Sequence, residues 1–169
     1  MDVGRLQSEN ASVEKRERPS CEIERKFLVK RMPVNLDQHK HYQIDQGYLA
    51  ATRDGLQVRL RRSGDKFSLT YKQGKGLARE EREIELTQEQ FDHLWPATEG
   101  HRLTKTRYHL PFGSHTVEID VYRGKNTGLV VAEVEFGDER QCSKFEPPDW
   151  FGRDVSGKAR YSNVKLACE

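Results

Sequence analysis

Two carboxylates and a lysine occupy alternate positions in the segment Glu22-Ile23-Glu24-Arg25-Lys26. Side chains of a β-strand point to opposite faces with period two, so Glu22, Glu24 and Lys26 share one face. Neighbouring carboxylates can hold a hard divalent cation, and an ammonium group can bind an anionic oxygen. A half-buried strand that simply turns its polar face to water also explains such a segment when it occurs once.

The same pattern recurs along the chain as pairs of like charges two residues apart. These pairs are Glu22/Glu24, Arg59/Arg61, Glu81/Glu83, Lys105/Arg107, Glu118/Asp120 and Glu133/Glu135. Aliphatic or aromatic residues fill most of the positions between and beside them. Like charges that share a face repel one another, so a purely structural sheet gains nothing from the pairing. The repetition therefore favours strands whose charged faces line a common interior.

Alternating apolar and polar residues predict eight strands that are joined by hairpin-length links. The expected strands lie near residues 22–29, 41–49, 57–62, 66–72, 79–86, 101–110, 114–123 and 129–136. Thr87 and Gln90 form a capping-box pattern that opens a short helix ending near Trp95. Further helical turns are expected just before residue 39 and near residues 138–145 and 160–166. The predicted fold is α+β and mainly β: an eight-stranded antiparallel β-barrel, closed into a tunnel, with a few flanking helices.

The composition fits one globular domain over residues 20–169. Charged residues make up 33% of the chain, yet 29 basic side chains nearly balance 27 acidic ones. A nucleic-acid-binding protein should be lopsidedly basic, so we expect no nucleic-acid partner. Residues 1–19 are polar and lack periodicity, which predicts a disordered N-terminal leader.

The cysteines Cys21, Cys142 and Cys168 are odd in number and lack a CxxC spacing. The chain also lacks a long apolar run. Together these features predict a soluble, cytoplasmic protein of a reducing compartment, without a membrane partner. The oligomeric state stays open between a monomer and a homodimer.

Turning the charged faces inward would give a lumen that holds both acids and bases. The carboxylates would be Glu22, Glu24, Glu81, Glu83, Glu118, Asp120, Glu133 and Glu135, and the cations Lys26, Arg59, Arg61, Lys72, Lys105 and Arg107. Because the pairs of one sign sit on different strands from those of the other, we expect a carboxylate zone and a cation zone.

Carboxylate clusters suit Mg²⁺ or Mn²⁺ rather than zinc. Arginine and lysine side chains suit an anion with several negative oxygens, such as phosphate. A metal ion beside a polyanion that is also held by cations is the arrangement that phosphoryl transfer requires. The predicted substrate class is therefore a polyphosphate, free or attached to something small.

The segment Glu22-x-Glu24-x-Lys26 resembles the ExExK signature of the CYTH superfamily, the triphosphate tunnel metalloenzymes. Further segments resemble the family's other strands in the same order: Val58–Arg61 its RxR strand, Leu69–Lys72 its central lysine strand, Lys105–Tyr108 its KxRY segment and Glu133–Phe136 its terminal ExE strand. The likeness extends from about Cys21 to Leu166. The family's eight-stranded antiparallel tunnel agrees with the barrel predicted above.

The resemblance implies a role for each charged position. The metal ligands would be Glu22, Glu24, Asp120, Glu133 and Glu135. The triphosphate would be bound by Lys26, Arg59, Arg61, Lys72, Lys105 and Arg107. Lys26, Lys72, Glu81 and Glu83 would serve catalysis around an attacking water, without a covalent intermediate. Glu118 would lie near a tunnel mouth, and Arg160 and Tyr161 would belong to a C-terminal segment near one mouth.

Within the superfamily, the chain looks most like small bacterial members that hydrolyse inorganic triphosphate. The resemblance thus implies Mg²⁺- or Mn²⁺-dependent hydrolysis of tripolyphosphate to diphosphate and phosphate. A class IV-type adenylyl cyclase, which converts ATP to cyclic AMP, is an alternative because the same tunnel can bind ATP. A non-enzymatic polyphosphate- or nucleotide-binding module is a second alternative, although an anion binder has no need of so many acids.

Overall fold

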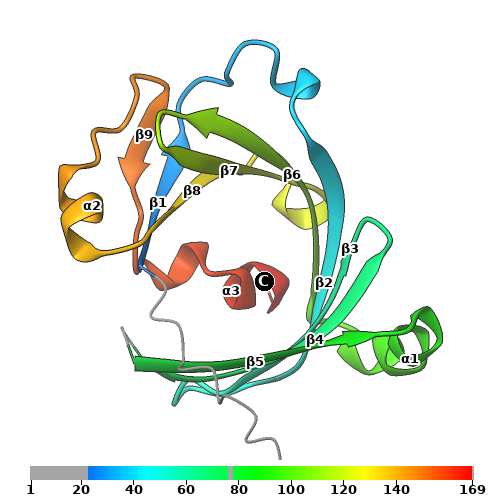
Figure 1. The fold of residues 1–169 in the computed structure, drawn as a ribbon. Helices are drawn as coiled ribbons and strands as arrows, with labels where there is room; N and C mark the ends of the chain where they lie inside the picture. The colour runs from blue at the N-terminus through cyan, green and yellow to red at the C-terminus, as the bar shows by residue number, and fades with distance from the viewer. Residues whose placement is uncertain (1–22, 76–77, 169) are drawn as a thin grey trace, which may run out of the picture.

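Most of the protein is one antiparallel sheet that curls around a central hollow (Figure 1). The computed structural model describes residues 23–75 and 78–168. Its strands are β1 (Ile23–Val29), β2 (His41–Ala51), β3 (Gln57–Ser63), β4 (Lys66–Lys75), β5 (Ala78–Leu86), β6 (Arg102–Phe112), β7 (His115–Tyr122), β8 (Val130–Phe136) and β9 (Phe151–Asp154). In space they follow the order β5-β4-β3-β2-β6-β7-β8-β1-β9. The eight predicted strands are confirmed, whereas Glu22 and the predicted leader over residues 1–19 lie outside the described residues.

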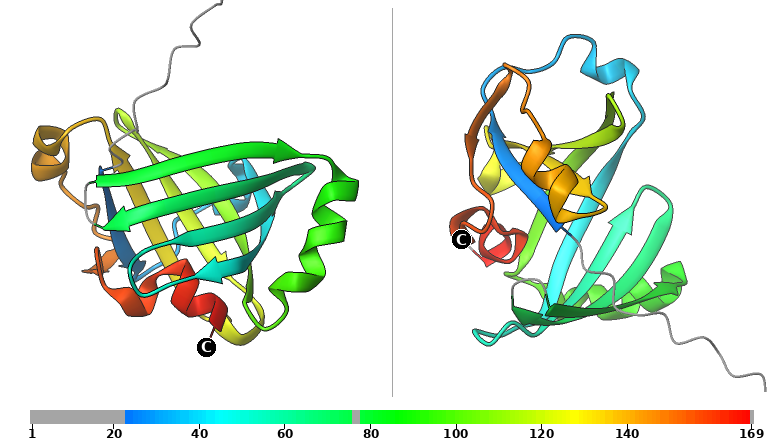
Figure 2. Two further views of the ribbon diagram at one scale, coloured as in Figure 1. Left: turned by 90° about the horizontal axis from the view of Figure 1, so that it is seen from below. Right: turned by 60° about the vertical axis from the view of Figure 1, so that its left-hand side comes forward.

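The prediction of a closed barrel is wrong in one respect, because the sheet is an open arch. Among the described strands, β5 and β9 form its two edges, and no ladder joins them. A strand has only two hydrogen-bonding edges, and β1 uses one for β8 and the other for β9. Since β9 occupies the edge that closure would need, β5 cannot pair with β1. Figure 2 shows β5 and β1 on opposite sides of the gap.

The short strand β9 has no counterpart among the predicted elements. It pairs with β1 through Phe27 opposite Asp154 and Val29 opposite Phe151. An ion pair of 2.8 Å joins Arg25 Nη2 to Asp154 Oδ2. This contact explains why Arg25 departs from the apolar pattern on its face of β1.

Short helices connect and flank the strands. They are η1 (Leu36–Gln38), α1 (Gln88–Leu94), η2 (Trp95–Thr98), η3 (Gly124–Asn126), α2 (Glu139–Lys144), η4 (Ala159–Tyr161) and α3 (Asn163–Cys168). The predicted capping box of α1 is confirmed: the Gln90 backbone N–H donates to Thr87 Oγ1 at 3.2 Å, and the Thr87 N–H donates to Gln90 Oε1 at 2.9 Å. Among the residues that the structure describes, none of these helices is long and apolar enough to cross a membrane.

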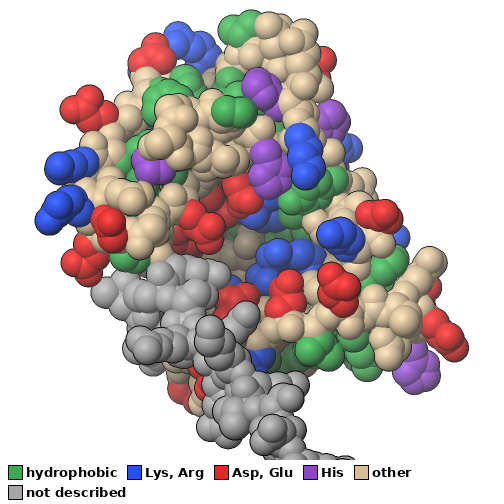
Figure 3. Space-filling model, in the orientation of Figure 1, with side chains coloured by type: hydrophobic (Ala, Val, Ile, Leu, Met, Phe, Trp, Pro, Cys, Tyr) green, Lys and Arg blue, Asp and Glu red, His purple; other side chains and the backbone are tan. Residues whose placement is uncertain are grey.

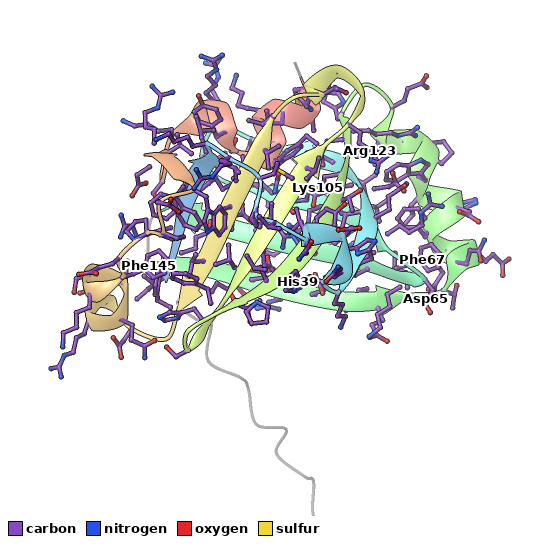
Figure 4. The ribbon with its side chains drawn as sticks, turned by 90° about the horizontal axis from the view of Figure 1, so that it is seen from above. His39, Asp65, Phe67, Lys105, Arg123 and Phe145 are labelled. Carbon is purple, nitrogen blue, oxygen red and sulfur yellow. The ribbon has the colours of Figure 1, made fainter. Side chains whose placement is uncertain are left out.

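The larger apolar core lies on the outer side of the sheet. Its buried members are Phe27, Leu36, Val117, Ile119, Ala132, Val134, Phe136, Phe145 and Phe151. The strands β1, β7 and β8 contribute alternate side chains to this core, and η1, α2 and β9 cover it (Figure 1). Figure 4 shows Phe145 beside α2, at this margin of the sheet. Because the apolar side chains face outward, the alternating charged ones face the hollow.

A second apolar cluster closes part of the hollow from within. The helix α3 lies inside the curve of the sheet (Figure 1) and buries Leu166 and Ala167 there. The Tyr122 hydroxyl donates to Asn163 Oδ1 at 2.7 Å. Lys125 Nζ and Asn126 Nδ2 donate to the last carbonyls of α3, each at 2.8 Å. These bonds satisfy backbone oxygens that a helix end leaves without partners.

Candidate active site

A cavity of about 1070 Å³ occupies the hollow of the arch. Its charged lining residues are Glu24, Lys26, Arg59, Arg61, Lys72, Glu81, Glu83, Arg107, Glu118, Glu133, Glu135 and Lys158. Figure 3 shows the hollow with Lys and Arg side chains on one side, Asp and Glu side chains around it, and histidines beside it. All the predicted site residues that the structure describes therefore line one cavity, except Lys105 and Asp120.

Arg59 lies on the wall that β3, β4 and β5 form, and 9% of it is exposed. Its Nη2 donates to Thr70 Oγ1 at 3.1 Å and lies 3.7 Å from Glu83 Oε2. Its Nε has no hydrogen-bond partner among the described residues. Burial and the neighbouring Arg61 charge lower the pKa of Arg59 to about 10, so it stays charged at neutral pH. This wall thus presents a largely buried positive charge to the cavity.

Arg61 on the same wall is held by a neutral side chain. Its Nε donates to Gln46 Oε1 at 3.4 Å, and Gln46 Nε2 donates to the Tyr48 hydroxyl at 2.7 Å. Gln46 is fully buried, and burial raises the pKa of Tyr48 to about 12. The sequence analysis missed both residues. Their alternate positions on β2, directly across from Arg61 and Arg59, were the signal that could have found them.

The predicted separation into a carboxylate zone and a cation zone is wrong for Glu81 and Glu83. Both lie on β5, where the register places Glu81 opposite Lys72 and Glu83 opposite Thr70. An ion pair of 2.6 Å joins Lys72 Nζ to Glu81 Oε2. Hence the cation wall carries its own carboxylates, which offset part of the repulsion between its positive side chains.

The facing wall, formed by β7, β8 and β1, does gather carboxylates. Glu24 stands directly opposite Glu135, and Glu118 directly opposite Glu133. Glu133 binds Lys26 Nζ at 2.7 Å. Burial alone raises the pKa of Glu133, but nearby cations, Lys26 among them, lower it below its usual value. Glu133 is therefore an ionised carboxylate at neutral pH.

Lys105 and Asp120 lie beneath this wall and form a fully buried ion pair. Asp120 Oδ1 accepts from Arg107 Nε at 2.7 Å, and Arg107 Nη2 reaches Glu133 Oε2 at 2.7 Å. Burial raises the pKa of Asp120, but Lys105 and Arg107 more than reverse this effect and hold it well below its usual range. Burial, together with the Arg107 charge, lowers the pKa of Lys105 to about 8. Figure 4 labels Lys105 in the interior, among the strands.

The C-terminal segment completes one side of the cavity. Lys26 donates its backbone N–H to Ser156 Oγ at 2.9 Å and its Nζ to the Tyr161 carbonyl at 3.4 Å. Tyr161 lines the cavity, whereas Arg160 is exposed and lies over the Tyr161 ring. Lys158, which the sequence analysis did not single out, adds a further cation to the lining.

The donor chemistry of the carboxylate wall fits a hard divalent cation. Like charges directly opposite each other on neighbouring strands are destabilising, and a cation between Glu24 and Glu135 would offset that repulsion. Carboxylate oxygens are the ligands that Mg²⁺ and Mn²⁺ prefer. Among the described residues, however, no three His, Cys, Asp or Glu side chains gather closely enough to hold a metal ion. Glu133 binds cationic side chains instead, and Glu22 is not described.

Comparison with known proteins agrees with this architecture. A family model described as the CYTH domain matches residues 20–165. An inorganic triphosphatase of Nitrosomonas europaea is 45% identical over 149 residues, which cover 86% of this chain and 96% of that protein. An inorganic triphosphatase of Acetivibrio thermocellus is 38% identical over 147 residues, which cover 86% of this chain and 92% of that protein.

A solved structure extends the likeness to three dimensions. The crystal structure of an inorganic triphosphatase superposes with a TM-score of 0.70 at 40% identity, and the match covers 88% of this chain and 95% of that one. The family match spans all the described strands, including those that carry the charged walls. The chain therefore belongs to the CYTH domain family, as its charged strands predict.

Proposed function

We propose that this protein is a divalent-metal-dependent triphosphatase that hydrolyses inorganic triphosphate to diphosphate and phosphate in the cavity. The observation that carries the proposal is the cavity lining, which combines the cations Arg59, Arg61 and Lys72 with carboxylates such as Glu24 and Glu135. A polyanion that binds together with a hard divalent cation would satisfy both sets of charges. Two relatives that share most of this chain carry the name inorganic triphosphatase.

The cations can bind a polyphosphate from two sides. Arg59, Arg61 and Lys72 come from the wall of β3 and β4, and Lys26 and Arg107 from the wall of β1 and β6. Arginine binds phosphate oxygens bidentately, while lysine acts as a point charge. A chain of three phosphates offers negative oxygens in several directions, which suits cations that converge from both walls.

The carboxylates suit the attack of water on a phosphoryl group. Glu24 and Glu135 would hold Mg²⁺ or Mn²⁺, which when bound supplies charge neutralisation and lowers the pKa of water. Glu81 and Glu83, on the opposite wall, would accept the proton of the attacking water. The water oxygen forms a bond to the terminal phosphorus, and the bond from that phosphorus to the bridging oxygen breaks. Lys72 and Lys26 would stabilise the charge that develops on the diphosphate.

A product assay tests the reaction directly. The protein is incubated with tripolyphosphate or ATP in the presence of Mg²⁺, Mn²⁺ or Ca²⁺, and the products are identified by chromatography. We expect phosphate and diphosphate from tripolyphosphate. Cyclic AMP and diphosphate from ATP would favour the cyclase instead, and tight binding without turnover would favour a binding module.

The metal assignment has its own test in Glu24→Gln. We expect this change to abolish metal-dependent turnover, because it removes a charge from the ligand set but keeps the shape of the side chain. Circular dichroism should show an unchanged fold. Glu146→Gln, at an exposed position outside the cavity lining, serves as the matched control and should retain activity. Full activity of the Glu24→Gln variant would refute the metal assignment.

A further inference from the structure

Arg61 differs from most of the other cations that line the cavity. Lys26, Arg59, Lys72 and Arg107 each lie within ion-pairing distance of at least one carboxylate. Arg61 has no such carboxylate among the residues that the structure describes, and its bond to Gln46 is the contact that orients it. Its charge is therefore not offset by a carboxylate of the described wall.

Gln46 differs from a surface glutamine in its burial and in its hydrogen bonds. It is fully buried on β2, and the register places it directly opposite Arg61. A buried amide is destabilising unless its polar atoms are bonded, and here the oxygen and the nitrogen each have a partner. Its oxygen contacts Arg61, and its nitrogen contacts Tyr48, which also lines the cavity.

We infer that Gln46 is a positioning residue, which orients Arg61 for polyphosphate without cancelling its charge. A carboxylate at this place would orient Arg61 equally well but would neutralise it. An apolar side chain would preserve the charge but leave Nε without a partner. The amide bonds only Nε and so leaves both terminal nitrogens for a bidentate contact with phosphate. This inference rests on the proposed function, since it assumes that Arg61 binds the substrate.

The inference predicts a loss of affinity from two opposite substitutions of Gln46. In Gln46→Glu the carboxylate keeps the contact with Arg61 and accepts from the Tyr48 hydroxyl, so the fold is retained while the charge of Arg61 is offset. In Gln46→Leu the contact is lost. We expect both changes to raise the Kd for tripolyphosphate about tenfold, which is the scale of one hydrogen bond to a charged group. Calorimetric titration without added metal measures the Kd independently of turnover.

The matched control is Gln43→Leu on the same strand. Gln43 is exposed and bonds to Asp45, outside the cavity lining, so we expect its replacement to leave the Kd unchanged. Arg61→Met provides a further control, because in that background Gln46→Leu should no longer change the Kd. A purely structural role for Gln46 would instead give equal effects with and without Arg61.

The outcomes separate this inference from the proposed function. Should the wild-type protein bind tripolyphosphate while Gln46→Glu binds it equally well, the inference is overturned and the proposed function stands. Should the wild-type protein fail to bind tripolyphosphate, both are overturned. If Gln46→Leu does not fold, Gln46→Glu still decides, because all its polar atoms can find partners.

Discussion

Arg59, which we propose to bind the substrate, illustrates how such a residue can lower the stability of the fold. A charge moved from water into the protein interior is destabilising unless ion pairs and hydrogen bonds offset the loss of hydration. Among the described residues Arg59 has one hydrogen bond, to Thr70, and a long contact of 3.7 Å to Glu83, and burial lowers its pKa to about 10. The folded protein thus retains a cation that its own structure satisfies incompletely.

Replacing Arg59 by methionine should separate binding from stability. We expect the Kd for tripolyphosphate to rise at least tenfold, because a cavity cation is lost. The free energy of unfolding should stay unchanged or increase by about 1 kcal/mol, since apolar replacements of buried ions are often neutral or stabilising. Urea denaturation and calorimetric titration measure the two quantities. A variant that is less stable but binds normally would contradict this view of Arg59.

Replacing Asp120, in contrast to replacing Arg59, should lower the stability of the protein. Replacing it by asparagine leaves Lys105 buried without its counter-charge, and breaking such a pair costs about 3–5 kcal/mol of stability. Because the folded-state pKa of Asp120 lies below its ordinary value of 3.8, its contribution is present above that pH and is lost as the pH falls further. The difference in unfolding free energy between wild type and Asp120→Asn should therefore persist at about pH 5 and narrow below pH 3.8.

An exposed ion pair provides the comparison for this measurement. Asp149 pairs with Arg31 at 2.7 Å, with side chains that are 80% and 68% exposed. Exposed pairs contribute little, so Asp149→Asn should change the unfolding free energy by less than about 0.5 kcal/mol. A comparable loss in both variants would mean that the burial of Asp120 has no energetic consequence.

Lys105 and Asp120 also mark what sequence patterns could not reveal about the site. Asp120 alternates with the apolar Ile119 and Val121, and Lys105 shares a face with Arg107, which correctly places both on the inner face of their strands. Alternation does not show how deep a side chain lies, nor which strand faces it across the cavity. Those depend on long-range packing, which also placed Glu81 and Glu83 beside the cations. Gln46 was missed because its signal is not local: it lies opposite Arg61 on the neighbouring strand, and only that register identifies it.

At the scale of elements, the strands follow directly from local sequence. Alternation and turn residues such as Gly55, whose φ is 100°, predict β2 and β3 close to their observed bounds. The capping box likewise predicts the start of α1, because it involves only residues that are close together in the sequence. By contrast, β9 has only four residues after a proline pair, and it forms because the edge of β1 is available. The open arch also depends on which strand edges pair with each other, and the periodicity of the sequence does not determine that pairing.

The contact between β2 and η2 gives a prediction at this scale. Gly47 lies against Thr98, so that a Cβ added at Gly47 would stand 2.5 Å from Thr98 Oγ1. Thr98 is fully buried and accepts a hydrogen bond from Arg102 Nε at 2.8 Å, so it cannot move away freely. Gly47→Ala should therefore lower the unfolding free energy by about 1–3 kcal/mol.

A second glycine serves as the control for this steric effect. At Gly137 a Cβ would meet the flexible Gln141 side chain at 3.4 Å, so we expect Gly137→Ala to be nearly neutral in thermal denaturation. Equal losses in the two variants would indicate that the general preference of these positions for glycine, rather than the contact with Thr98, is responsible.

At the scale of the whole molecule, the larger apolar core and the charged side chains are on opposite sides of one sheet, while α3 adds a smaller apolar cluster inside the arch. The larger core, with Val117 and Ile119 fully buried, supports the sheet from outside, while the charged side chains surround the cavity within. This arrangement lets the interior keep a polar cavity that an ordinary apolar core could not contain.

This arrangement predicts that an anionic ligand stabilises the whole protein. At a concentration a hundred times its Kd, a ligand adds about 2.7 kcal/mol to the unfolding free energy, so tripolyphosphate should raise the melting temperature by several degrees. Added sodium chloride should weaken the effect, because salt screens the attraction between cations and phosphate. Differential scanning calorimetry measures both shifts. A rise of the same size with monophosphate would argue against contacts that span the cavity.

The open side of the arch has a mechanical consequence. The wall of β3, β4 and β5 and the wall of β7, β8 and β1 are joined through β2 and β6, and among the described strands no hydrogen bonds connect the free edges β5 and β9. Among the described strands, the two walls are therefore connected only through β2 and β6. A polyphosphate bound by Arg59 on one wall and by Lys26 on the other would act as a cross-link between the two walls. Binding of the polyphosphate would then restrict the motion of β2 and β6, including residues that do not touch the ligand.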